Sequence, residues 1–488
     1  MPIVAGVDVS TQSSTVELRD ADTGALLGSG RSLHPRTRPP VSEQDPRAWW
    51  SAFGLALAAA SESAATDLRD IRAISVGGQC HGLVMLDSAG QPLRDAKLWN
   101  DTTSSPQAAR MVAESQPQEW ADAVGSVPTA AFTITKLAWI ADHEPWHLER
   151  LQMLLLPHDY VNFRLTGRTV TDRSEASGTG YYAAHEGRWR LDLLERWVAA
   201  REWEGALPTV LQPDQPAGFV MPSVADELGL GRDVLVGPGG GDQHLGAVGL
   251  GLASGEVAYS LGTSGVVCTV SDVPVFDASG DVDGVADCTG GYLPLASTLN
   301  ATKVTDWAAS LLGVDVQALG EMALAPAASD RPVLAAYLDG ERTPNRPGGT
   351  GVLAGLTTAT TREEFARSAF EGVLLGLTRA HERIRDAGAP ADGAVTITGG
   401  GARSTAFRQI LADLLQAPVA LRDADEATAR GAAIQAAAVL RGREVSELAA
   451  ELRPATLLSV EPLSAVSGSL RERYLAAAKW TGADRKEV

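Results

Sequence analysis

Near the N-terminus, short apolar runs separated by turn residues predict three strands, a helix and a fourth strand. The first three strands are Ile3–Val9, Thr15–Arg19 and Ala25–Arg31. The Asp- and Gly-containing turn between the second and third favours a hairpin. Asp45-Pro46 supplies an N-cap and a proline at the first helical position, so the alanine- and leucine-rich stretch that follows predicts a helix through about Ala65. A strand over Ile71–Val76 completes the order β-β-β-α-β.

The second half repeats this plan and then alternates helix with strand. Three strands are predicted, followed by a helix from about Lys303 to Leu312; the strands are Glu256–Ser260, Gly265–Val270 and Tyr292–Ala296. The later segments are helix Arg362–Asp386, strand Ala394–Thr398, helix Ser404–Leu415, strand Pro418–Leu421 and helix Glu426–Leu440. This alternation predicts an α/β protein whose mixed sheets are covered by helices on both faces. Small residues on every side of the last helix predict that this helix packs tightly against its neighbours and has no catalytic role.

The chain of 488 residues exceeds the length at which a single hydrophobic core keeps growing, so two domains are expected. We place their boundary just beyond the glycine-rich stretch Gly237–Gly241, which gives domains 1–250 and 251–488. Between Leu98 and Pro213 the pattern is weaker, and its helical stretches are broken by irregular segments: Gln118–Val124, Lys136–His143 and Leu191–Ala200. We interpret this region as an insertion that shapes a substrate pocket.

Composition and charge narrow the class of partner. A formal net charge of −19 argues against nucleic acid, because nucleic-acid binding depends on clustered Lys and Arg that neutralise phosphates. The three cysteines lack CxxC spacing, so the sequence indicates neither a zinc site nor a disulfide framework. An N-terminus that enters a strand at once and the absence of a long apolar run predict a cytoplasmic protein without a membrane span.

Two glycine-flanked aspartates, Asp8 and Asp242, each follow a short apolar strand, and each has a turn rich in hydroxyl and glycine residues after it. Such turns present backbone N–H groups and hydroxyls that hold phosphate oxygens, so the two halves are expected to clamp a nucleotide phosphate tail. Because the chain is acidic, Mg²⁺ and backbone N–H groups are expected to supply the local positive field. The turn residues predicted to contact ATP are Thr11, Gln12 and Ser13, and Gly262, Thr263 and Ser264.

Two longer motifs resemble the signatures of the FGGY family of carbohydrate kinases. Thr133–His143 resembles the first signature, although Ala131 departs from the residues expected at its position. Gly351–Leu356, followed after seven residues by Glu364–Glu371, matches the second signature completely. The resemblance covers nearly the whole chain and implies two ribonuclease H-like domains of the actin/hexokinase/Hsp70 superfamily, with a cleft between them and with ATP and Mg²⁺ as cofactors. Asp242 is then the expected general base, and Asp8 the expected Mg²⁺ ligand, directly or through water.

The resemblance extends to the adenosine and sugar sites. Gly399–Ala402 allows a flat ligand to approach the backbone and lacks the Gly-x-Gly-x-x-Gly spacing of dinucleotide sites, so Gly400, Gly401 and Ala402 are the expected adenosine contacts. Gly78–Gly82 and Lys97–Asp101 are similar to the corresponding motifs of family members that phosphorylate xylulose, with Cys80 in place of Met. This similarity implies sugar binding by Gln79, Cys80, His81, Trp99, Asn100, Asp101 and Gln243.

The resulting hypothesis is ATP-dependent phosphorylation of D-xylulose at O5 in pentose catabolism. The alternative within the family is a kinase that acts on ribulose, gluconate, glycerol or a pentitol. This alternative stays open because Cys80 and Ala131 depart from the family motifs and leave the sugar specificity of the pocket undecided. The alternative from a different class is an actin- or Hsp70-like protein that uses nucleotide to gate partner binding. The sugar motif and both FGGY signatures count against that alternative. The sequence leaves open whether the protein is a homodimer.

Overall fold

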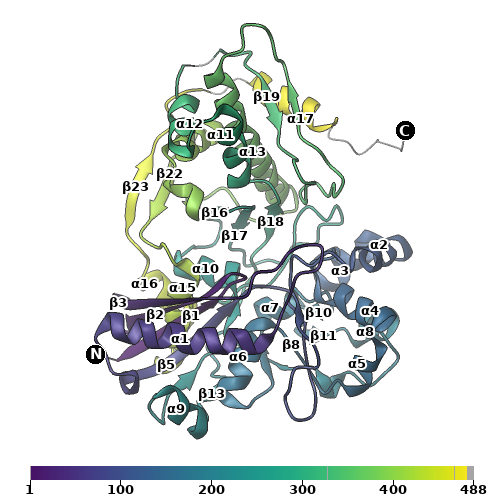
Figure 1. The fold of residues 1–488 in the computed structure, drawn as a ribbon, viewed down its shortest axis with the longest axis vertical. Coiled ribbons are helices and arrows are strands. Elements are labelled where there is room, and N and C mark those ends of the chain that lie inside the picture. Colours follow the sequence, from purple (N-terminus) through teal and green to yellow (C-terminus); the bar gives the residue numbers. More distant parts are fainter. Residues whose placement is uncertain (1, 327, 466–467, 481–488) are drawn as a thin grey trace.

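The computed structural model describes residues 2–326, 328–465 and 468–480, which form two α/β halves stacked along the long axis of the molecule (Figure 1). Each half is built around one mixed sheet. Among these residues no helix is both long and apolar enough to cross a lipid bilayer.

The sheet of the first half has the order β13-β14-β5-β1-β2-β3, with β15 also paired to β5. Its strands are β1 (Ile3–Val9), β2 (Ser13–Asp20), β3 (Leu26–Leu33), β5 (Ile71–Gly78), β13 (Gly218–Phe219), β14 (Leu235–Val236) and β15 (Gly240–Gly241). β1 is antiparallel to β2 and parallel to β5, with Asp8 opposite Gly77, so the carboxyl ends of β1 and β5 lie at one edge of the sheet. β2 also pairs antiparallel with β3, which confirms the predicted hairpin.

The second half repeats this topology in the order β18-β17-β16-β21-β22-β23. Its strands are β16 (Val257–Leu261), β17 (Gly265–Thr269), β18 (Leu295–Thr298), β21 (Val395–Thr398), β22 (Val419–Arg422) and β23 (Thr456–Val460). As in the first half, the first strand is antiparallel to the second and parallel to a later one. The predicted duplication is confirmed, and the third strand begins at Leu295 rather than Tyr292 because its pairing with β17 starts there.

Helices cover both faces of the sheets. In the first half α1 (Pro46–Ala64) packs on β2 and β3, and α15 (Ala427–Arg441) packs on β1 and β5 from the other side. Asp45 caps α1 by accepting a hydrogen bond from the backbone N–H of Arg47, as expected. The second half carries α11 (Thr302–Leu312), α12 (Val316–Ala323), α13 (Arg362–Asp386), α14 (Thr405–Leu415) and α17 (Gly468–Ala478).

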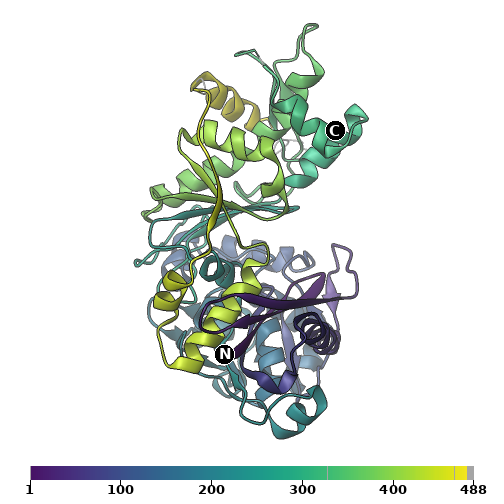
Figure 2. The same ribbon diagram turned by 90° about the vertical axis from the view of Figure 1, so that its left-hand side faces the viewer.

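The helix α15 belongs to the second half by sequence and to the first half by packing. After β22 the chain crosses to the first half, forms α15 and α16 (Val445–Glu451) there, and returns in β23 (Figure 2). α15 also packs against α10 (Asp242–Gly249), and glycines make this contact close. A Cβ on Gly431 would overlap the carbonyl oxygen of Leu245, and one on Gly249 would overlap that of Ala427. The expected tight packing of this helix is confirmed.

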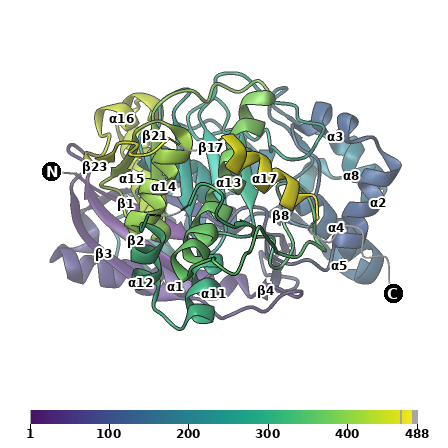
Figure 3. The same ribbon diagram turned by 90° about the horizontal axis from the view of Figure 1, so that it is seen from above.

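The region of weak pattern forms a mainly helical layer at the side of the first half (Figure 3). The predicted helices appear as α3 (Pro117–Val124), α4 (Thr133–His143) and α8 (Leu191–Trp197). The sequence did not indicate the other helices of this region, which are α2 (Ser105–Glu114), α5 (Pro145–Arg150), α6 (Pro157–Thr166) and α7 (Arg173–Ser177), nor α9 (Pro222–Leu228), which follows it.

Short elements complete the fold. The strands are β4 (Glu43–Gln44), β6 (Val84–Leu86), β7 (Ala96–Lys97), β8 (Met153–Leu155), β9 (Val170–Asp172), β10 (Tyr182–Ala183), β11 (Arg188–Trp189), β12 (Thr209–Leu211), β19 (Val333–Ala335) and β20 (Val352–Ala354). The 3₁₀ turns are Leu68–Asp70, Glu204–Ala206 and Gly400–Arg403.

Candidate active site

A cavity of about 130 Å³ is lined by residues of both halves. That size is comparable to cavities that hold a small molecule. The first half contributes Cys80, His81, Trp99, Asp242, Gln243 and His244. The second half contributes Ser264, Val266, Asp283, Val285, Leu295, Ser297, Thr298, Leu299 and Arg342. The structure thus brings four of the seven predicted sugar contacts, Cys80, His81, Trp99 and Gln243, and the predicted base Asp242 into contact with one small space.

The ring of His81 is held in one orientation and one tautomer. Its Nδ1 lies 2.6 Å from the carbonyl oxygen of Gly178, and a carbonyl only accepts, so Nδ1 carries the proton. The ring also stacks on Phe132 at 5.0 Å between centroids. Burial lowers the pKa of His81 to about 3, so the ring is neutral at pH 7. Its Nε2 is therefore an acceptor for a hydroxyl proton.

The backbone of His81 is as constrained as its ring. Its φ of +64° lies in the left-handed region, which a residue with a side chain seldom adopts. Its carbonyl oxygen accepts hydrogen bonds from Thr133 Oγ1 and Lys136 Nζ, both at 3.1 Å. These two donors belong to α4, so the first FGGY-like motif holds the sugar motif in place.

Asp242 begins α10, where its carboxylate lines the same cavity as His81. Oδ1 accepts a hydrogen bond from the backbone N–H of Gln243 at 2.7 Å, and the Sγ of Cys80 lies 3.5 Å from the same oxygen. Burial raises the pKa of Asp242, which favours proton uptake from a bound hydroxyl.

Asp8 is the next-to-last residue of β1 and is 9 % exposed. Its Oδ2 accepts a hydrogen bond from Ser10 Oγ at 2.5 Å, whereas the buried Oδ1 has no hydrogen-bond partner among the described residues. Burial, with a smaller contribution from the charge of Asp242, raises the pKa of Asp8 to about 7. A buried carboxylate oxygen without a donor suits a cation ligand, so this residue fits the Mg²⁺ role expected of it.

A chain of hydrogen bonds joins the first phosphate turn to the sugar motif. Trp99 Nε1 donates to Thr11 Oγ1 at 2.9 Å, and Thr11 Oγ1 donates to Gln79 Oε1 at 3.0 Å. Gln79 is 1 % exposed and lies behind the cavity wall rather than in it. Ser13 is also buried, in β2, where it accepts a hydrogen bond from Arg31 Nε. Gln12 between them is exposed.

Asn100 and Asp101 do not line the cavity. The carboxylate of Asp101 is fully buried, accepts backbone N–H groups of Ser42 and Thr103 at 2.8 and 3.0 Å, and pairs with Lys97 at 3.4 Å. Its hydrogen-bonding capacity is therefore used within the fold. In this structure Asp101 holds its own loop in place, and its expected contact with the sugar stays a prediction.

A larger cavity of about 780 Å³ lies in the second half. Its lining includes four of the predicted nucleotide contacts, which are Gly262, Thr263, Gly400 and Gly401. Ala402 is 2 % exposed and lies beneath this surface, and Thr11, Gln12 and Ser13 are not among the lining residues. Thr263 lines the larger cavity and Ser264 lines the smaller one, so a single turn separates the two spaces.

Sequence reasoning missed two charged residues of the small cavity. Arg342 Nη1 donates to Ser297 Oγ at 3.0 Å, and burial raises the pKa of Asp283, which lines the same space, to about 6. Both side chains come from irregular segments of the second half, where periodicity carries no information. Only the closeness of Arg342 to the second signature in sequence could have drawn attention to it.

Three comparisons relate the chain to known proteins. Residues 3–249 match the N-terminal domain of the FGGY family of carbohydrate kinases, and residues 257–440 match its C-terminal domain. A protein named xylulose kinase from Streptomyces coelicolor is 42% identical over 454 residues, which is 92% of this chain and 90% of that protein.

Solved structures of carbohydrate kinases also resemble this chain over nearly its whole length. The crystal structure of xylulose kinase from Bifidobacterium adolescentis shares 39% identity with a TM-score of 0.86, over 97% of this chain and 99% of that one. The crystal structure of gluconate kinase from Lactobacillus acidophilus shares 25% identity with a TM-score of 0.87, over 98% and 96% of the two chains.

Proposed function

The chain belongs to the FGGY family of carbohydrate kinases, and we propose that this ATP-dependent sugar kinase transfers the γ-phosphate of ATP to O5 of D-xylulose. The observation that carries the proposal is the placement of Asp242 and His81 in one small cavity, one turn away from a nucleotide-sized cavity. The relatives named xylulose kinase, at up to 42% identity, support the choice of sugar.

In the proposed reaction, the sugar hydroxyl loses its proton to the carboxylate of Asp242 while its oxygen bonds to the γ-phosphorus. The bond from that phosphorus to the β,γ-bridging oxygen breaks, and ADP leaves. The raised pKa of Asp242 brings its proton affinity closer to that required at neutral pH. His81 Nε2 accepts a second sugar hydroxyl and so fixes the orientation of the carbon chain.

The turn that contains Gly262, Thr263 and Ser264 is proposed to hold the phosphate tail where it passes from the larger to the smaller cavity. The residue proposed to hold Mg²⁺ is Asp8, directly or through water, because its buried Oδ1 lacks a donor. When bound, the ion supplies positive charge that offsets the charge developing on the phosphate oxygens.

The division into domains 1–250 and 251–488 remains part of the proposal. The ends of the two matched family segments, at residues 249 and 257, support it. The helices α15 and α16, which belong to 251–488 by sequence, nevertheless pack on the first half.

Gluconate is the second candidate substrate, and Arg342 is the observation that favours it. Its guanidinium lines the small cavity, and such a group pairs well with a substrate carboxylate. The neighbouring Asp283 works against this, because a buried carboxylate repels an acid.

A coupled assay of ADP release against xylulose, ribulose, gluconate, glycerol and a pentitol tests the proposal. We expect the highest kcat/KM with D-xylulose, and product analysis should place the phosphate on O5. A higher kcat/KM with gluconate would transfer the assignment to that substrate. ADP release that no sugar stimulates would instead favour an actin- or Hsp70-like nucleotide switch.

A further inference from the structure

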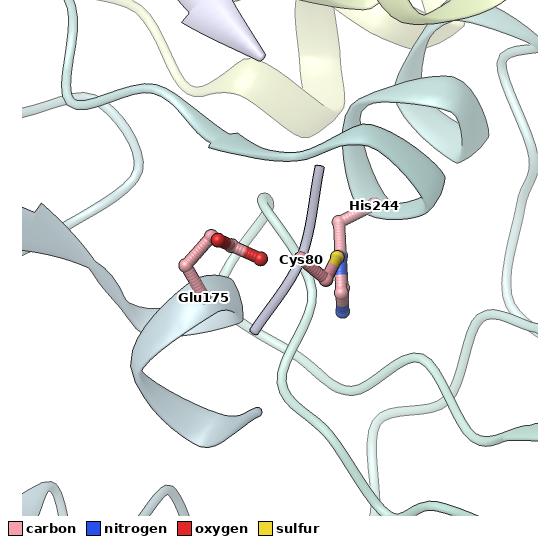
Figure 4. A group of neighbouring side chains, drawn as sticks. All are labelled: Cys80, Glu175 and His244. Carbon is pink, nitrogen blue, oxygen red and sulfur yellow. The ribbon is translucent and has the colours of Figure 1, made fainter. Parts of the chain in front are cut away.

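Three side chains with metal-binding atoms lie close together (Figure 4), and two of them, Cys80 and His244, line the small cavity. They are Cys80, just after β5, Glu175 in α7 and His244 in the first turn of α10. One ligand atom from each residue lies within 4.8 Å of the other two. Cys80 Sγ and His244 Nδ1 are 3.9 Å apart, close to the separation of two ligands on one tetrahedral ion.

The three atoms face a common space that exists because residue 241 is glycine. A Cβ at Gly241 would lie 2.7 Å from Cys80 Sγ and 2.9 Å from Glu175 Oε1, and closer still to His244 Nδ1. The three ligand atoms converge on the point that this Cβ would occupy. An ion can therefore lie between them, slightly further from the backbone than that point. Zn²⁺ lies about 2.0–2.3 Å from nitrogen, oxygen and sulfur ligands, so small side-chain shifts are sufficient.

The cluster also contains buried polar atoms that the protein itself leaves unused. Glu175 is 1 % exposed, and neither of its carboxylate oxygens has a hydrogen-bond partner in the described part of the chain. His244 is 3 % exposed, and its Nδ1 is the ring nitrogen that faces Cys80 Sγ, at 3.9 Å. A buried carboxylate without a donor is costly unless it is protonated or paired with a cation, so a bound cation would compensate it.

The fold positions these ligands firmly. The backbone N–H groups of Ser174 and Glu175 donate to the carboxylate of Asp172, which caps α7. Ser174 Oγ in turn accepts a hydrogen bond from the N–H of Gly241 at 3.1 Å. On the far side of Glu175, Oε2 lies 3.9 Å from Nδ1 of the fully buried His158.

We propose that Cys80, Glu175 and His244 form a binding site for a borderline-soft divalent cation such as Zn²⁺, separate from the proposed Mg²⁺ site at Asp8. Thiolate and imidazole favour Zn²⁺ over Mg²⁺, which prefers oxygen ligands and octahedral geometry. Binding replaces the thiol proton of Cys80, which passes to solvent. Three protein ligands leave one position of a tetrahedral ion open. This inference does not depend on which sugar the kinase phosphorylates.

Spacing along the chain did not indicate this site, because its ligands come from positions 80, 175 and 244. Zinc motifs recognised in sequences place pairs of ligands a few residues apart on one turn. Here each ligand comes from a different element. Cys80 also stands where the resembled sugar motif has Met, so the strongest ligand of the cluster is the residue at which this chain departs from that motif.

Titration of the chelator-treated full-length protein with Co²⁺, in the absence of sugar and ATP, tests the proposal. We expect one equivalent to bind with a thiolate-to-Co²⁺ charge-transfer band in the near ultraviolet, and one equivalent of Zn²⁺ to remove the band. Cys80→Ser should abolish it, and Glu175→Gln should weaken Co²⁺ binding at least about tenfold. Cys268→Ser, the matched control, should keep it, because Cys268 lies in β17 outside the cluster.

Alkylation of the wild-type protein keeps the proposal testable if a variant fails to fold. Zn²⁺ should slow the modification of Cys80 by iodoacetamide, followed by peptide mass spectrometry, whereas Mg²⁺ should leave its rate unchanged. Absence of the Co²⁺ band from the wild-type protein would overturn the proposal. So would a band that persists in Cys80→Ser, or a rate of Cys80 alkylation that does not change with Zn²⁺.

Discussion

At the scale of single residues, the two aspartates at the strand ends differ in what surrounds their carboxylates. Asp8 is 9 % exposed and keeps one buried oxygen without a donor. Asp242 lines the small cavity, and its Oδ1 accepts the N–H of Gln243. The first environment suits a fixed cation and the second suits exchange of a proton with a ligand, as their proposed roles require.

Replacing Asp242 with Asn should remove the proton acceptor while keeping the size of the side chain. We expect kcat to fall about 10²–10⁴-fold, the usual contribution of general-base catalysis, with unchanged affinity for ATP. Turnover at saturating ATP and xylulose, with nucleotide binding by calorimetry as the control, measures this. A variant that stays within a few-fold of wild type would exclude Asp242 as the base.

Replacing Asp8 with Asn should stabilise the metal-free protein at high pH. In the folded protein the pKa of Asp8 is raised from 3.8 to about 7, so the neutral carboxyl is the form that favours folding. Its contribution to stability is complete below pH 3.8 and is lost as the pH rises to about 7. The full loss corresponds to about 4 kcal/mol at most. Thermal unfolding with chelator should therefore show Asp8→Asn more stable than wild type at pH 8, with the difference shrinking toward pH 4. Equal differences at both pH values would contradict the shift.

Replacing His81 with Ala should change the choice of sugar more than the use of ATP. Loss of one acceptor for a buried hydroxyl costs about 1–3 kcal/mol, so kcat/KM for D-xylulose should fall about 5–150-fold. An analogue that lacks or inverts the contacted hydroxyl should lose less, and the affinity for ATP should not change. Comparable losses for all sugars would indicate that His81 only maintains the fold, through its contacts with Gly178 and α4.

At the scale of elements, the helices α15 and α10 pack with their backbones in close contact. Gly431→Ala should lower the stability of the protein by about 1–3 kcal/mol, because its Cβ meets backbone atoms of Leu245 and Gly249, which cannot move aside as side chains do. Gly246→Ala on α10 is the matched control: its Cβ would be 3.7 Å from the nearest atom, an ordinary contact. Denaturant unfolding measures both, and equal midpoints for the two variants would contradict the packing.

Elements with strong local signals could be predicted from the sequence closely. α13 covers the predicted range Arg362–Asp386, because Thr361 and Glu364 form a capping box at its start. The helices α6 and α7 were not predicted, because buried polar side chains interrupt their apolar pattern; these include His158, Asp159, Asn162 and Glu175. Part of the candidate site was not predicted either. Glu175 and Arg342 reach it only through tertiary contacts, which no local pattern records.

At the scale of the whole molecule, the two cavities divide the reaction between the halves. Asp242 belongs to the first half, whereas the larger cavity is built by the second. Phosphoryl transfer therefore requires both halves to hold their ligands at once, and closure around the sugar is expected to exclude water.

This division predicts slow hydrolysis of ATP in the absence of sugar. ADP release without xylulose should stay below about a hundredth of the sugar-stimulated rate, since water lacks the positioning that the bound hydroxyl receives. Small-angle scattering should show a smaller radius of gyration when sugar and nucleotide are both bound. Rapid sugar-independent hydrolysis with an unchanged radius would contradict closure.

The crossing of α15 and α16 onto the first half has a consequence for synthesis on the ribosome. β1 and β5 are made early, yet the helix that covers one of their faces ends at residue 441. At about 5–20 residues per second, the roughly 200 residues between α10 and the end of α16 take about 10–40 s to make. During that interval the nascent first half exposes an apolar surface that the completed chain buries. A chaperone that binds nascent chains should therefore occupy ribosomes until α15 emerges, and should leave once it has docked.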